Sequence, residues 1–217
     1  MSSIKKLFHL GLLSILLLTL ASCEGGRNHH DGPVYIADIL SDQPSDGDIA
    51  FDPVRQAFSI TNGPNTLFFG IDDQDPNLPE FRAFLDFPLD GSTGADVVPS
   101  HAKIVSATLE VFVSEVSYAP VIPTLIDLVT YSLSGLQAGD FNSPPLLTKT
   151  TNFFSADQGA IVAINVTPLL QEAQRLGLPD FQIRFILDLA EDIGFVGIDD
   201  HPTVSLTAPR LIVDYEF

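Results

Sequence analysis

The sequence predicts an all-β protein, built as an antiparallel sandwich of two sheets with one short helix. Many segments alternate apolar and polar residues, and turns rich in Gly and Pro separate them. The most regular segment is 104–113, IVSATLEVFV, in which every second residue from Val105 to Val113 is apolar. Alternation of this length is typical of a half-buried antiparallel strand.

The other expected strands are shorter and follow the same pattern. We expect them at 34–40, 56–61, 66–70, 81–87, 121–132, 160–166, 181–189, 193–198 and 210–217. In 81–87 the alternation places Arg82 and Asp86 on the outward side. Pro120 and Pro123 place the start of 121–132 at a sheet edge or a bulge, because proline cannot donate to a neighbouring strand. The polar segments 41–48, 72–79, 90–100 and 136–145 are expected to be turns and loops.

One helix is expected, beginning at Thr167 and ending at Gly177. Thr167 suits the N-cap, and Pro168 suits the first helical position, where the missing N–H costs nothing. The apolar stripe of this helix consists of Leu169, Leu170, Ala173 and Leu176. No internal repeat and no composition break follow residue 33, so we expect a single β-sandwich domain over 34–217.

The first residues predict a secretory signal peptide over 1–22. Lys5 and Lys6 precede a largely apolar run, 7–20, that is too short to span a membrane comfortably. The following Leu-Ala-Ser-Cys resembles the bacterial lipobox, which predicts that Cys23 is lipidated and that 23–33 is a flexible tether. The expected location is the bacterial cell envelope, at the outer membrane or cell surface, with the lipid chains as the membrane contact. The alternative is an ordinary signal peptide with an incidental cysteine.

The charge balance excludes one class of partner and suggests one cofactor. The chain has 28 acidic and 10 basic residues, for a net charge of −18. Nucleic acid is excluded, because too few basic groups are present to neutralise phosphates. Acidic loops could bind calcium, which takes hard oxygen ligands; the alternative is plain solubility in a salty environment. The candidate calcium ligands are Asp72, Asp73, Asp75, Asp188, Asp192, Asp199 and Asp200.

Two tyrosines are the candidate ligand-binding residues. Sugar-binding surfaces stack aromatic faces on pyranose rings, and Trp and Tyr suit that role because one edge stays polar. The chain has no Trp and four Tyr. Tyr215 falls on the inward face of the last strand, whereas Tyr118 and Tyr131 flank the proline-containing segment. We therefore expect Tyr118 and Tyr131 to be the exposed candidates.

Four motifs in order carry a family resemblance: RAFLDF at 82–87, AKIVSATLEVF at 102–112, NVTPLLQ at 165–171 and APRLIVDY at 208–215. Their order resembles the DNRLRE-type, or disaggregatase-related, domains and the similar carbohydrate-binding modules, over most of the chain from about residue 34. The resemblance implies a jelly-roll β-sandwich that is secreted or surface-attached and acts as an accessory module for polysaccharide binding or surface architecture. The family often has a Trp in its helix, where this chain has Ala173.

These observations favour a lipid-anchored, extracytoplasmic, non-catalytic domain that binds a glycan or another cell-surface component. No G-x-S-x-G, H-E-x-x-H, P-loop or G-x-G-x-x-G motif is present. The alternative is a purely structural or protein-interaction envelope lipoprotein, with another envelope protein as partner. A third hypothesis, a polysaccharide-degrading enzyme, needs two opposed carboxyl groups in a cleft.

Overall fold

The computed structural model describes residues 32–42, 44–63, 65–92, 96–188, 193–201 and 207–217. The chain divides into two compact units, Met1–Gly32 and Pro33–Phe217, and the second holds all the elements described below. Cys23, the signal peptide and most of the tether lie outside the described residues, as does Asp192. No helix within the described ranges is long and apolar enough to cross a membrane.

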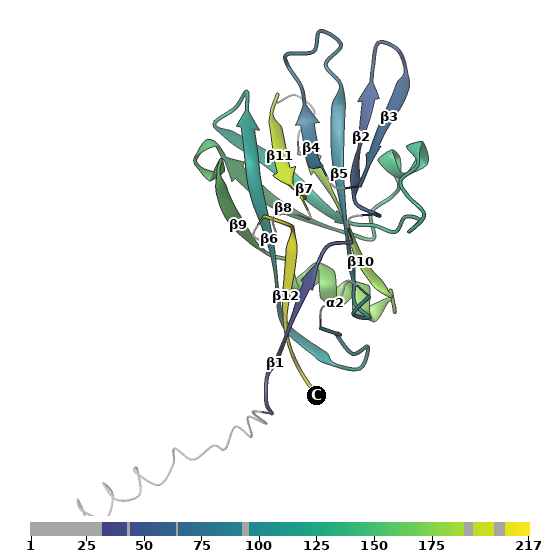
Figure 1. The fold of residues 1–217 in the computed structure, drawn as a ribbon, viewed down its shortest axis with the longest axis vertical. Helices are drawn as coiled ribbons and strands as arrows, with labels where there is room; N and C mark the ends of the chain where they lie inside the picture. The colour runs from purple at the N-terminus through teal and green to yellow at the C-terminus, as the bar shows by residue number, and fades with distance from the viewer. Residues whose placement is uncertain (1–31, 43, 64, 93–95, 189–192, 202–206) are drawn as a thin grey trace, which may run out of the picture. The chain divides into compact units, whose positions relative to one another are not determined.

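The regular structure of the second unit, as far as it is described, consists mostly of antiparallel strands (Figure 1). The strands are β1 (Tyr35–Leu40), β2 (Gly47–Asp52), β3 (Ala57–Asn62), β4 (Thr66–Ile71), β5 (Glu80–Pro88), β6 (Lys103–Ser117), β7 (Val121–Leu128), β8 (Leu147–Phe154), β9 (Ala160–Asn165), β10 (Asp180–Leu187), β11 (Phe195–Asp199) and β12 (Arg210–Glu216). The helices are α2 (Thr167–Arg175) and two short 3-10 turns, η1 (Ala138–Asn142) and η2 (Ser155–Asp157).

The strands form one sheet that curls over itself, in the order β1-β12-β6-β11-β4-β5-β10-β7-β8. Beside this path, β2 pairs with β3 and β5, and β9 pairs with β6. The two halves of the sheet join through β4 and β5, which share only the pairs Gly70–Phe81 and Ile71–Glu80. The predicted all-β, jelly-roll-like sandwich with one short helix is therefore confirmed.

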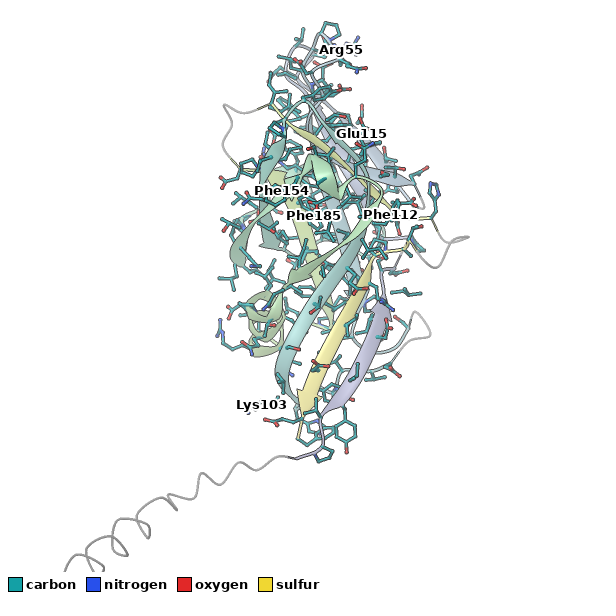
Figure 2. All side chains as sticks on the ribbon, turned by 90° about the vertical axis from the view of Figure 1, so that its left-hand side faces the viewer. Arg55, Lys103, Phe112, Glu115, Phe154 and Phe185 are labelled. Atoms are coloured by element: carbon teal, nitrogen blue, oxygen red, sulfur yellow. The ribbon has the colours of Figure 1, made fainter. Side chains whose placement is uncertain are left out.

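Strand β6 is the central strand of one half of the sheet. Figure 2 shows it running from Lys103 past Phe112 to Glu115, beside β12, which separates it from β1. Its inward side chains from Ala107 to Val113 are fully buried, as predicted. Val105, predicted on the same face, is 46% exposed, whereas Ile104 is buried. The reason is a register shift opposite Val105, between Asp214 and Tyr215 of β12. The shift interrupts the alternation of side chains, so Ile104 rather than Val105 faces the core.

The prediction that 121–132 starts at an edge holds for its first residues only. Strand β7 lies between β10 and β8, but its pairing with β10 begins at Thr124, so Val121–Pro123 pair with β8 alone among the described strands. The Pro123 carbonyl accepts a hydrogen bond from the Asp188 N–H at 2.8 Å, just beyond the last residue of β10. A residue's N–H and C=O point to the same side of a strand. The N–H that Pro123 lacks would therefore face the end of β10, where the ladder stops anyway.

Strands β2 and β8 were not predicted, and the helix start differs in detail. The α-helix begins at Thr167, but its N-cap residue is Val166. The Thr167 hydroxyl oxygen instead accepts a hydrogen bond from the Ala107 N–H at 2.8 Å, which ties the helix to β6. Leu169, Leu170 and Ala173 are buried as expected, while the last member of the stripe, Leu176, is exposed.

The close approach at Gly70 makes a stability test possible. A Cβ at Gly70 would lie 2.0 Å from the Gly194 carbonyl oxygen, and Gly70 has a φ of +107°. We expect Gly70→Ala to lower the free energy of unfolding by at least about 2 kcal/mol. Gly63→Ala is the matched control, because Gly63 has a φ of +83° but open space around it. Backbone strain alone should cost about 1 kcal/mol there, as urea denaturation can measure. Equal costs at both positions would contradict the described approach of β4 to Gly194.

Candidate functional site

An open groove of about 490 Å³ crosses the region where β2, β3, β4 and β5 come together. Its lining combines two aromatic rings with hydroxyl, amide, carboxyl and imidazole groups. The lining residues are Asp48, Thr61, Asn65, Thr66, Phe68, Phe81 and His201. Most of them come from strands, so the sheet itself holds the polar groups in place.

The aromatic floor of the groove is a packed cluster around Phe195. The Phe68 and Phe195 rings stack with centroids 4.9 Å apart, and Phe81 meets Phe195 edge-on at 5.4 Å. Phe195 is buried, whereas Phe68 and Phe81 are only half-buried. The neighbouring Gly197 permits this arrangement, because a Cβ there would lie 3.1 Å from Phe68 and 2.8 Å from the Ser114 hydroxyl.

Tyr118 extends this aromatic cluster beyond the groove. Its ring lies 6.2 Å from that of Phe195, and 38% of its surface is exposed. Its backbone has a φ of +73°, an uncommon conformation for a residue with a side chain. The Tyr118 hydroxyl donates to Asp72 Oδ1 at 2.7 Å. Desolvation and this hydrogen bond raise the pKa of Tyr118 to about 12. The expected exposure of Tyr118 is thus found.

Asp48 is the carboxyl group of the groove lining. Its Oδ2 accepts a hydrogen bond from the Phe68 N–H at 3.1 Å, so a β2 side chain holds a β4 backbone group. Burial raises the pKa of Asp48 to about 6, and the hydrogen bonds from Phe68 and Thr61 limit the rise. At the other end of the lining, His201 Nε2 lies 3.4 Å from Asp199 Oδ1.

Tyr131 is not an exposed candidate, contrary to the prediction. Its ring packs edge-on against Phe84 at 5.5 Å, and its backbone N–H donates to Gln182 Oε1 at 2.8 Å. Its hydroxyl is buried and has no hydrogen-bond partner among the described atoms. The polypeptide around η1 packs on the outer face of β5 and β10 and leaves Tyr131 only partly exposed. With its hydroxyl buried and its ring packed on Phe84, Tyr131 is a poor candidate for stacking on a sugar.

The aspartates of the first predicted calcium loop have local structural partners. Asp72 Oδ1 accepts from Tyr118 and from the Gln74 N–H, and Asp75 Oδ1 accepts from the Asn77 N–H. Asp73 is exposed. These contacts are those of aspartates that stabilise turns.

The other predicted calcium ligands lie at the ends of β10 and β11. Asp188 follows β10, and Asp200 follows β11 and is fully buried. Within the described ranges, no three carboxylate, imidazole or thiol side chains are arranged as a metal site. Calcium binding by these loops stays a prediction.

A cluster of buried acids, Asp46, Asp86 and Asp200, was not recognised in the sequence. Burial and the charge of Asp200 raise the pKa of Asp46 well above its ordinary value. Burial likewise raises the pKa of Asp86 to about 6 and that of Asp200 to about 7. Asp86 was expected to face outward. Its side chain points away from the main hydrophobic core, which contains its neighbours Leu85 and Phe87, but it is fully buried all the same.

Two arginines on the outer face of this half-sheet have structural partners. Arg184 Nη2 donates to Asp127 Oδ2 at 2.7 Å, with both side chains buried. Its Nη1 donates to the carbonyl oxygens of Asp140 and Phe141 in η1. Arg82 lies over the Phe141 ring, 3.8 Å from its centroid. These contacts fix the polypeptide that partly covers Tyr131.

A second cavity, of about 290 Å³, lies beside α2 and has a mainly apolar lining. Leu89, Val98, Ile104, Leu170 and Leu178 contribute most of its apolar walls. Apart from the edge residues Asp90 and Gln174, it presents few groups that could fix the orientation of a polar ligand. The groove over β4 and β5 is therefore the better candidate site.

No protein-family model matches the chain, and no match was found among curated proteins. The relation to DNRLRE-type domains stays a prediction from the four sequence motifs.

The raised pKa of Asp48 predicts a specific pH dependence. The folded pKa of about 6 exceeds the ordinary 3.8, so the protonated carboxyl stabilises the fold. That contribution is complete below about pH 4 and is lost as the pH rises through 6. Asp48→Asn should therefore raise the free energy of unfolding at pH 7.5 by about 1 to 2 kcal/mol, with no gain at pH 4.

Urea denaturation in chelator-containing buffer at both pH values tests this. Asp73→Asn is the control and should change stability at neither pH, because Asp73 is exposed. A variant Asp48→Asn that is destabilised equally at pH 4 and pH 7.5 would show that folding does not raise the pKa of Asp48.

Proposed function

We propose that this domain is a non-catalytic binding module that holds a neutral glycan in the groove over β4 and β5. In this proposal the lipidated Cys23 anchors the domain in the bacterial cell envelope. The observation that carries the proposal is the lining of the groove, where half-buried Phe68 and Phe81 lie among hydroxyl, amide and carboxyl groups.

The chemistry of a sugar ring matches these groups. A pyranose has apolar C–H faces and a rim of hydroxyls, so it binds where aromatic faces adjoin hydrogen-bonding groups. Phe68 and Phe81 supply the aromatic faces. Thr61, Asn65 and Thr66 supply donors and acceptors, and Asp48 supplies further acceptors. Because the strands hold these side chains, little conformational entropy would be lost on binding.

The charge of the groove favours a neutral over an acidic glycan. Among the described residues, the lining has a carboxyl group, Asp48, and no Lys or Arg. The net charge of −18 adds to the negative potential around the groove. An acidic polysaccharide would be repelled and would find no Arg fork to pair with its carboxylates.

The same lining argues for binding without hydrolysis. Glycoside hydrolases place two carboxyl groups on opposite sides of the scissile bond, about 5 to 9.5 Å apart. In the described lining, Asp48 is the only carboxyl group. Asp199 lies against His201 and is not part of the lining.

An exposed apolar cluster supports the alternative, a protein-interaction role. Val34, Tyr35, Ile36 and Phe217 are all exposed at the start of β1 and the end of the chain. The Tyr35 ring lies 5.4 Å from that of Phe217. This cluster adjoins β1, which pairs with β12 on one side and with no other described strand on its other side. An envelope protein could add a strand there.

Affinity gel electrophoresis with soluble β-glucan, xylan and mannan tests the proposed function, with alginate as the acidic counterpart. We expect retardation by at least one neutral polysaccharide and none by alginate. Phe68→Leu, which keeps apolar volume but removes the flat ring, should weaken binding about five- to tenfold. Phe154→Leu is the matched control, because Phe154 is an exposed ring on β8 (Figure 2).

Two results would count against glycan binding in this groove. One is that no neutral polysaccharide retards the protein, which would shift the weight to the protein-interaction role. The other is that Phe68→Leu and Phe154→Leu bind as tightly as the unaltered protein, which would place the ligand elsewhere.

A further inference from the structure

Three aspartates from distant parts of the chain are buried together between the two halves of the sheet. Asp46 comes just before β2, Asp86 lies in β5, and Asp200 follows β11. None of the three has any exposed surface. The hydrogen bond from the Asp86 N–H to Asp46 Oδ1, at 2.7 Å, joins the first two. Asp200 is the charge that acts most strongly on Asp46.

Each of these carboxyl groups has one oxygen with a hydrogen bond and one without. Asp86 Oδ2 accepts from the Ser45 hydroxyl at 2.9 Å, and Asp200 Oδ1 accepts from the Ser41 hydroxyl at 3.4 Å. Asp46 Oδ2, Asp86 Oδ1 and Asp200 Oδ2 have no partner among the described atoms. Buried polar atoms in native proteins nearly always have partners, so three orphans in one cluster require an explanation.

No basic side chain of the described residues forms an ion pair with these three aspartates. Arg184 pairs with Asp127, Arg82 with Glu80, and Arg210 with Asp38 and Glu110. Burying unpaired carboxylates costs several kcal/mol each. A bound cation would offset that cost.

We propose that Asp46 and Asp200 bind a calcium ion between the two halves of the sheet, at a site distinct from the glycan groove. Calcium takes six to eight oxygen ligands from carboxylates, hydroxyls, backbone carbonyls and water. The Ser41 hydroxyl donates to Asp200 Oδ1 at 3.4 Å, and it also lies near enough to Asp46 to lower the pKa of that carboxyl. The described side chains include no cluster of three metal ligands. The site is therefore a carboxylate pair, completed by hydroxyl and carbonyl oxygens and by water.

A second, independent feature points to the same place. The buried Tyr131 hydroxyl also lacks a partner, and Asp46 and Asp86 are the charges that act on it most strongly. An unpartnered hydroxyl beside unpartnered carboxylates is the surrounding that a hydrated cation would complete, because its water ligands can bond to the hydroxyl.

Thermal unfolding of the full chain in detergent at pH 7.5 and fixed ionic strength tests the site. After removal of metal with EDTA, 2 mM calcium should raise the Tm by about 5 °C or more. Asp200→Asn should abolish this shift, because it removes one carboxylate while keeping the size of the side chain. Asp73→Asn, at an exposed member of the predicted loop, should show the full shift.

Retained calcium is the measurement that does not depend on a variant. Elemental analysis of the unaltered protein after gel filtration should find one calcium per chain. No retained calcium together with an unchanged Tm would overturn the proposal, even if Asp200→Asn does not fold. A calcium shift that persists in Asp200→Asn but disappears in Asp73→Asn would move the site to the 72–75 loop.

Terbium luminescence tests the location directly. The chain has no Trp, so bound terbium would be sensitised through tyrosine. We expect emission that calcium displaces and that Tyr131→Phe reduces by more than half. Tyr131→Phe removes a hydroxyl that has no described partner, so the fold should tolerate it. Tyr118→Phe should leave the emission unchanged; the opposite pattern would contradict a site at Asp46 and Asp200.

Discussion

The candidate site depends on two hydrogen bonds in which carboxylates of the β2 segment accept backbone amides of other strands. Asp48 Oδ2 accepts the Phe68 N–H of β4, and Asp46 Oδ1 accepts the Asp86 N–H of β5. These bonds form where the sheet curls and the ladder between β4 and β5 is reduced to two residue pairs. There, carboxyl oxygens accept hydrogen bonds from backbone N–H groups, which elsewhere in the fold are bonded to neighbouring strands.

Because side chains replace backbone pairing there, polar groups gather where the two halves of the sheet meet. The bond to Asp48 fixes Phe68 against Phe195, and the same carboxyl lines the groove beside Thr61. The bond to Asp46 leaves its second oxygen buried without a partner. The groove and the acid cluster thus both depend on carboxyl groups in and just before one short strand, β2. A ligand in the groove and a cation in the cluster would both stabilise the curl of the sheet.

The sequence revealed the strands that bury one regular face, and it did not reveal those that do not. Alternation identified β6 and β10 because both contribute a row of core residues. Strand β8 buries only Phe153, so it leaves almost no periodic signal. Strand β2 follows one buried acid, Asp46, contains another, Asp48, and places Ile49 in a separate small core. The burial of the Tyr131 hydroxyl depends on residues far away in sequence, which no local pattern reports.

The most direct test of this account is an NMR measurement on the Phe68 amide proton. If Asp48 accepts it, the proton should be protected from exchange with solvent, and its chemical shift should titrate with a midpoint near pH 6, the pKa of the buried carboxyl. Rapid exchange, or a midpoint near the ordinary 3.8 of an exposed aspartate, would contradict it. Rapid exchange would mean that β2 does not hold β4 through its carboxylate, and a midpoint near 3.8 would mean that burial does not raise the pKa of Asp48.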